Sequence, residues 1–181
     1  KEVDEPRFKR MLIARFNLLP ELKRMIHHEI ALAKAGRQGR IILKMNALQD
    51  LTMIDELYKA SEAGVKIDLI VRGICCLVPG ESFSSNIRVT RIVDRFLEHA
   101  RVWYFGNDGD NLYRRIEAVT PVFDKSLKQE LIDMLDMQLR ANWKACWVDK
   151  ELKNIFKRTP DEPKVRAQYD FYQYLYKKNI E

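Results

Sequence analysis

The stretch from Lys66 to Phe105, KIDLIVRGICCLVPGESFSSNIRVTRIVDRFLEHARVWYF, decides how this chain folds. It opens with a β-branched, apolar run over residues 66–71, which is typical of a buried strand and ends at Arg72. Residues 86–97 carry apolar side chains at helical spacing and predict a helix. A second strand is expected over residues 100–105. A strand, a helix and a strand in succession indicate an α/β fold.

His99 and Arg101 stand where the chain passes from the predicted helix to the second strand. A period of two places both on one face, so a titratable imidazole lies beside a permanent cation. Arg72 ends the first strand, and open α/β sheets usually bind ligands at that edge. One imidazole and two guanidinium groups at neighbouring strand ends predict a phosphate site.

Each of these residues also has a structural interpretation. A histidine near the start of a strand is more often structural than catalytic, and an arginine at a strand end is usually a solvated surface residue. The His-x-Arg spacing alone leaves both interpretations open. A binding site is favoured because a crossover helix could bring the ends of the two strands together.

The rest of the chain alternates strand-like and helix-like segments. Helices are expected over residues 20–35, 50–63, 124–139 and 165–176, and strands over residues 40–46 and 113–122. The strand–helix–strand order from Arg40 to Arg72 predicts parallel neighbours, so that Lys44, Asn46 and Arg72 gather at one edge. The predicted fold class is α/β, with a central mixed β-sheet flanked by helices. Residues 1–181 are expected to form a single domain, with 124–181 as its helical C-terminal part.

Composition restricts the function only broadly. The net charge of +6 favours an anionic partner without choosing among nucleic acid, phosphate chains and a membrane surface. No apolar run approaches the roughly 20 residues that span a bilayer. Two of the three cysteines are adjacent, Cys75 and Cys76, and the three form neither a disulfide framework nor a metal spacing, so a cytoplasmic location is expected. The absence of a starting Met indicates a segment of a longer chain.

Several common nucleotide and metal motifs are missing from the sequence. It has no glycine-rich phosphate loop and no serine nucleophile elbow, so cationic side chains would have to hold any nucleotide. His27 and His28 stand next to each other on a predicted helix and point about 100° apart. Zinc would require histidines four residues apart and a third ligand. No metal site is therefore predicted.

Ordered strings over residues 16–174 resemble the C-terminal catalytic domain of bacterial polyphosphate kinase. The longest is GVKIDLIVRGIC at residues 64–75. The others are LKMN at 43–46, SNIR at 85–88, IVDRFLEH at 92–99, YRRIE at 113–117, DKEL at 149–152 and KVRAQ at 164–168. Their number and order make the resemblance far more specific than any one string.

The resemblance implies a phospholipase D-like fold and names candidate site residues. In this family two such domains each supply a histidine to a shared cleft. His99 matches the histidine of the second domain, in a His-x-Lys pattern that here reads His99-x-Arg101. Arg72 and Arg115 match arginines that contact phosphate. The histidine that becomes phosphorylated belongs to the first domain and has no match here. Further candidate contacts are Lys44, Asn46 and Arg101.

The same resemblance implies the reaction and its partners. The family reversibly transfers the terminal phosphate of ATP to inorganic polyphosphate, and His99 would serve as general acid or base. Mg²⁺ would accompany ATP. Other expected partners are ADP, the N-terminal domains of the parent chain and further copies of it in a homo-oligomer. No nucleic-acid partner is expected, and a peripheral membrane association is left open.

Two other interpretations of the whole chain remain. One is a non-catalytic basic α/β module that binds nucleic acid or other polyanions, although its cations stand singly and not in the basic–aromatic stripe usual for nucleic-acid binding. The other is a folded half-site that is inactive by itself. The family pattern also has a short strand, containing Ser-Ala-Asp-Trp, between the positions of Asp110 and Asn111. Its absence is either a true deletion or an omitted loop, and the omitted loop is favoured.

Overall fold

The computed structural model describes residues 11–13, 17–106, 111–115, 118–158, 160–178 and 180, with the backbone alone for 111–115 and 118–119. Within them, the strands are β1 Leu12–Ile13, β2 Arg40–Met45, β3 Lys66–Val71, β4 Ile87–Ile92, β5 Val102–Phe105, β6 Asn111–Arg115, β7 Ala118–Pro121, β8 Ala145–Val148 and β9 Asn154–Phe156. The helices are α1 Leu18–Lys34, α2 Leu51–Glu62, α3 Lys125–Arg140 and α4 Ala167–Lys178, with a 3₁₀ turn at Ser82–Ser84.

The described strands form one mixed sheet in the order β1-β7-β6-β5-β2-β3-β4-β8-β9. At its centre β2, β3 and β4 run parallel, while β5 pairs antiparallel with β2. The predicted parallel pairing of residues 40–46 with 66–72 is confirmed, since Ile41 pairs with Ile67 and Leu43 with Leu69. The fold class, a central mixed sheet with helices packed on it, is confirmed as well.

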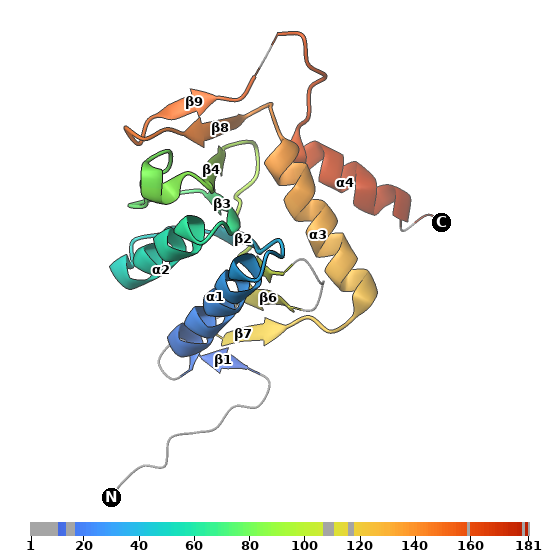
Figure 1. Cartoon of the computed structure of the whole chain (residues 1–181). Coiled ribbons are helices and arrows are strands. Elements are labelled where there is room, and N and C mark those ends of the chain that lie inside the picture. Colours follow the sequence, from blue (N-terminus) through green and yellow to red (C-terminus); the bar gives the residue numbers. More distant parts are fainter. Residues whose placement is uncertain are drawn as a thin grey trace, which may run out of the picture.

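Helices cover both faces of the sheet (Figure 1), with α1 and α2 on one side and α3 and α4 on the other. Side chains alternate between the two faces along each strand, so one strand contributes to the hydrophobic core on either side of the sheet. Ile41 and Leu43 of β2 pack with the α1–α2 side, whereas Ile42, between them, packs with Met134 and Leu135 of α3. Lys44 falls on the same face as Ile42, so the sequence places a lysine inside the second core. In the described part of the chain, no helix is long and apolar enough to cross a membrane.

Local signals account for the ends of the main helices. Asp50 caps α2, because its carboxylate accepts from Met53 N over 2.9 Å, and Asp124 caps α3 by accepting from Leu127 N over 2.9 Å. Gly64 follows α2 with a φ of +91°, a conformation that residues with a Cβ rarely adopt. These signals make the helices readable from the sequence.

The helix predicted over residues 86–97 is wrong. Ile87–Ile92 form β4, which pairs with β3 from Ile67↔Ile87 to Ile70↔Thr90. Alternate residues Ile87 and Val89 are buried against the α1–α2 side, as a strand requires. The stretch is rich in β-branched residues, which favour strands. Its hydrogen bonding to the free edge of β3 stabilises a strand more than the helical spacing of its apolar residues would stabilise a helix.

Two further segments differ from the predictions. The single strand predicted over 113–122 is a pair of antiparallel strands, with Arg114 of β6 opposite Thr120 of β7. Residues 124–181, predicted as helical, also contain β8 and β9, which extend the sheet where Thr90 of β4 pairs with Trp147. Both strands are short, and their sequences carry little periodicity from which to predict them.

Candidate functional site

Two parallel strands, β2 and β3, end at the same edge of the sheet, next to Asn46 and Arg72; we call this the carboxyl edge. The two segments stay paired beyond the strands, because Gly73 N donates to Asn46 O over 2.7 Å. The Arg72 guanidinium also donates from Nη2 to the side-chain Oδ1 of Asn46. The structure thus brings two of the predicted site residues into direct contact.

Arg72 keeps a hydrogen-bonding group that the described residues do not use. Its Nη1 is buried and has no hydrogen-bond partner among them. A buried donor without an acceptor is costly, and the guanidinium fork matches the oxygens of phosphate. An anion at the carboxyl edge would supply the missing acceptor.

Residues 93–101, which we call the His99 loop, connect β4 to β5 along the carboxyl edge. These two strands lie on opposite sides of the β2–β3 pair. Because β5 is antiparallel to β2, with Val102 opposite Lys44, the loop must pass the ends of β3 and β2 to reach it. His99 is exposed on this loop. His99 and Arg72 therefore lie at one edge, although an antiparallel strand brings them there and not the predicted crossover helix.

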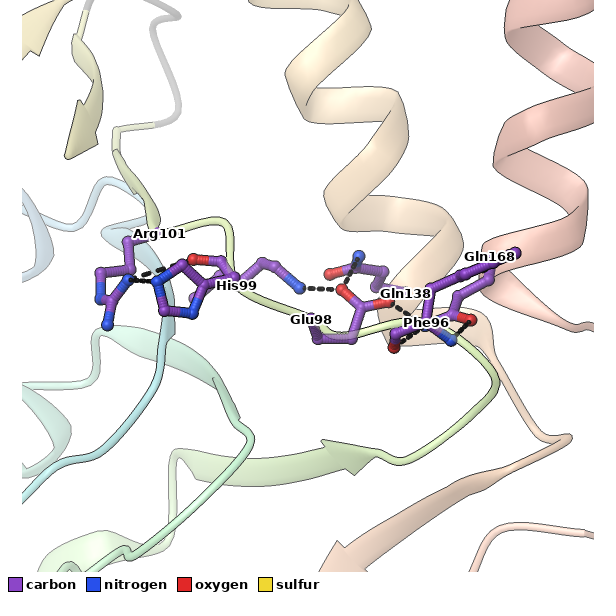
Figure 2. Close-up of polar contacts among 7 residues, drawn as sticks. Phe96, Glu98, His99, Arg101, Gln138 and Gln168 are labelled. Carbon is purple, nitrogen blue, oxygen red and sulfur yellow. Dashed lines mark hydrogen bonds and ion pairs between the residues drawn. The ribbon is translucent and has the colours of Figure 1, made fainter. Parts of the chain in front are cut away.

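His99 and Arg101 contact each other directly (Figure 2). Arg101 Nη1 lies 3.3 Å from His99 Nε2 and donates to the His99 carbonyl oxygen over 3.1 Å. A guanidinium can only donate, so Nε2 is the acceptor in this contact and the proton of a neutral ring lies on Nδ1. The pair combines one proton-transfer group with one fixed positive charge.

Lys44 is turned toward the His99 loop and buried beneath it. Its ammonium Nζ lies 2.5 Å from Glu98 Oε2, and its side chain is 2% exposed. Burial lowers the pKa of Lys44 below its ordinary value; Glu98 opposes this shift and the charge of Arg72 adds to it. Lys44 therefore belongs electrostatically to the site, with its ammonium paired to Glu98.

Arg115 is placed by its backbone alone. It is the last residue of β6, and β6 pairs with β5 so that Arg114 lies opposite Val102. The end of β6 therefore lies at the carboxyl edge beyond β5. The prediction put Arg115 early on its strand, but it reaches this edge at the strand's end. The structure does not describe the side chain of Arg115. Residues 107–110, which include Asp110, also lie outside the described residues.

The described side chains do not form a metal site. Among them no group of three or more His, Cys, Asp or Glu residues could hold a metal ion. Glu98, the carboxylate next to His99, already accepts from Lys44, Gln138 and Gln168. His27 contacts Glu56, with 2.7 Å between Nε2 and Oε2.

A pocket elsewhere in the domain is unsuited to phosphate. A largely apolar pocket of about 370 Å³ lies between α1, β2 and α2, lined by residues that include Leu22, Met45 and Leu57. None of its lining residues is a cation that could bind phosphate.

Glu98 was not among the predicted site residues. A lysine in an apolar strand nevertheless indicates that a carboxylate must pair with it in the folded protein.

The chain matches known polyphosphate kinases over most of its length. The family described as polyphosphate kinase C-terminal domain 2 matches residues 11–168. The polyphosphate kinase of Vibrio parahaemolyticus is 42% identical and that of Escherichia coli K12 is also 42% identical, over 97% and 85% of this chain. The alignment with the Vibrio protein has 189 positions, more than the 181 residues here, so that relative has residues without a counterpart.

A solved structure gives the same result. The crystal structure of polyphosphate kinase from Porphyromonas gingivalis superimposes with a TM-score of 0.92 and 50% identity, over 96% of this chain. The chain spans 27% and 24% of the Vibrio and Escherichia proteins and 29% of the Porphyromonas chain. From the extent of the family match, the chain belongs to the polyphosphate kinase family, in which it corresponds to C-terminal domain 2.

Proposed function

We propose that this chain forms the C-terminal part of the active site of a polyphosphate kinase, which reversibly transfers the terminal phosphate of ATP to inorganic polyphosphate. The proposal is supported by the family match together with two pairs of candidate residues at the carboxyl edge, Arg72 with Asn46 and Arg101 with His99. The relatives are named polyphosphate kinases, and the chain spans about a quarter of their length.

Phosphoryl transfer requires neutralised oxygens and an aligned nucleophile more than covalent chemistry by the protein. Arg72 would hold the transferring group through its buried Nη1, and Arg115 would approach from the end of β6. His99 would act as general acid or base, with Arg101 fixing its ring through Nε2. The nucleophilic histidine would come from a domain outside these residues. ATP would enter with Mg²⁺ held by its phosphates.

The proposal is tested in the complete polyphosphate kinase that contains this chain, by following polyphosphate formation from ATP. Arg72→Ala and His99→Ala should each lower kcat by about a hundredfold or more, as for other preorganised charge-stabilising groups. Two exposed residues on α1 provide matched controls, Arg24→Ala and His28→Ala. The controls should keep wild-type activity, and all four variants should keep the wild-type Tm within a few degrees.

Wild-type activity in Arg72→Ala and His99→Ala would contradict the proposal. So would a fall in Tm large enough to explain the lost activity, because it would return both residues to a structural role.

A further inference from the structure

The His99 loop is held at every second residue by the beginning of α4. Asp94 accepts two hydrogen bonds from Arg166, with Nε at 2.8 Å and Nη2 at 2.7 Å. Phe96 and Glu98 both bond to Gln168. The side chains of Val93, Phe96 and Leu97 are exposed, so Phe96 is held through its backbone. The loop bends at residues 94–96 and is held there by Arg166 and Gln168, at the start of α4.

Gln168 uses its whole side-chain amide on this loop. Its Oε1 accepts from Phe96 N over 2.9 Å, and its Nε2 donates to Phe96 O over 2.7 Å. The second hydrogen on Nε2 reaches Glu98 Oε1, also over 2.7 Å. One glutamine therefore fixes both the backbone and a side chain within three residues of His99.

Glu98 joins this contact to the sheet and to α3 (Figure 2). Its Oε2 accepts from Lys44 Nζ at 2.5 Å and from Gln138 Nε2 at 3.2 Å. The side chain of Glu98 extends toward the helices, while that of the next residue, His99, extends the other way toward Arg101. Fixing Glu98 therefore restrains the backbone from which His99 projects.

The helix that holds the loop is itself tied to α3. Tyr174 donates to Asp133 over 2.7 Å, and Lys178 contacts Glu130 at 2.9 Å. Phe171 packs on the core formed by Met134 and its neighbours. Through Gln168 and Arg166, the loop is therefore anchored to a helix that is itself fixed to the rest of the domain.

We propose that Gln168, together with Arg166 and Glu98, positions His99 for phosphoryl transfer. The inference rests on the proposed function, since it assigns these residues a role in His99's work and not a contact with substrate. A misplacement of about 1 Å in a reacting group can cost about a hundredfold in rate. Loss of a positioning residue should therefore lower kcat more than it changes KM or Tm.

The test uses the complete polyphosphate kinase with Gln168→Ala and, as a matched control, Tyr174→Phe. Both substitutions remove side-chain hydrogen bonds of α4, but only the first touches the His99 loop. We expect Gln168→Ala to lower kcat at least about tenfold, with KM for ATP within about threefold of wild type. Tyr174→Phe should retain wild-type kcat. The Tm of the two variants should be similar.

Hydrogen exchange measured by mass spectrometry provides a readout that needs no turnover. The peptide covering residues 93–101 should exchange faster in Gln168→Ala and unchanged in Tyr174→Phe. Unchanged exchange of that peptide, or wild-type kcat in Gln168→Ala, would overturn the inference. A wild-type enzyme that made no polyphosphate from ATP would overturn the proposed function instead, and the exchange experiment would still decide whether α4 holds the loop.

Discussion

Lys44 and Glu98 form a buried ion pair, with 2.5 Å between Nζ and Oε2 and side chains that are 2% and 13% exposed. The lysine belongs to β2 in the middle of the sheet, and the glutamate belongs to the His99 loop above the strand end. A charge in this position is stable only when its partner is present. The pair therefore couples the placement of the loop to the integrity of the core.

Removal of one member of this pair should destabilise the domain strongly. Glu98→Ala leaves the Lys44 ammonium buried without its carboxylate, and the free energy of unfolding should fall by about 3–5 kcal/mol. The double variant Lys44→Met/Glu98→Gln removes both charges, and it should be much closer to wild type. Urea denaturation measures both values. Equal losses in the two variants would show that the pairing of charges does not matter here.

A second lysine should make stability depend on pH. Lys157 Nζ lies 3.5 Å from the ring centroid of Trp147 and donates to Leu139 O over 3.1 Å. Burial, with help from Arg88, lowers its pKa from 10.5 to about 8. Between these values the unfolded chain binds more protons than the folded one, so this residue's contribution to the free energy of unfolding rises with pH.

The comparison is between wild type and Lys157→Met, both in a Cys146→Ala background because the Cys146 thiol interacts with Lys157. The stability of the lysine protein relative to the methionine protein should increase from pH 8 to pH 10.5. It should be constant between pH 6 and pH 7. A difference that does not change across the alkaline range would refute the lowered pKa.

The charge of Arg72 can be cancelled without removing the residue. Asn46→Asp places a carboxylate where Asn46 Oδ1 now accepts from Arg72. The resulting ion pair should weaken binding of inorganic polyphosphate by about tenfold or more, since charge-assisted pairing occupies the guanidinium. Asn46→Ala removes the acceptor but leaves the charge, so it should weaken binding much less than Asn46→Asp does. Titration calorimetry at one ionic strength compares the three proteins.

The isolated 181-residue chain should bind polyphosphate and not turn it over. Its cationic carboxyl edge supplies charge, and the proposed nucleophilic histidine lies elsewhere. Binding should weaken steeply as salt rises from about 0.05 to 0.5 M, because exposed charges are screened over a shorter distance. ATP formation from ADP and polyphosphate by this chain alone would contradict the expectation.

The central strands and the helix starts could be predicted because their signals are local. Residues 66–71 are mostly apolar and follow Gly64, and Asp50 and Asp124 cap the helices that follow them. β4 could not be identified in this way. Val93 and Phe96, counted toward a helical face, are exposed in the structure, and only the pairing with β3 determines that the preceding residues form a strand.

The same distinction applies to the site. The local sequence pattern predicts that Arg72 ends a strand. It also predicts that His99 and Arg101 lie next to each other. The partner of Lys44 does not, because Glu98 lies 54 residues further along the chain. Gln168 is farther still from the loop it contacts. Such contacts depend on the strand order, which no periodicity in the sequence reveals.

The contacts of α4 with the His99 loop have a consequence for biosynthesis. The sheet centre, β2, α2 and β3, is encoded in one continuous stretch and can pair while the chain is still growing. The residue that holds Phe96 is made 72 positions later. A chain that ended before Arg166 would have its central strands but would lack the contacts that anchor the His99 loop. The carboxyl edge is therefore completed only after the scaffold that carries it has been translated.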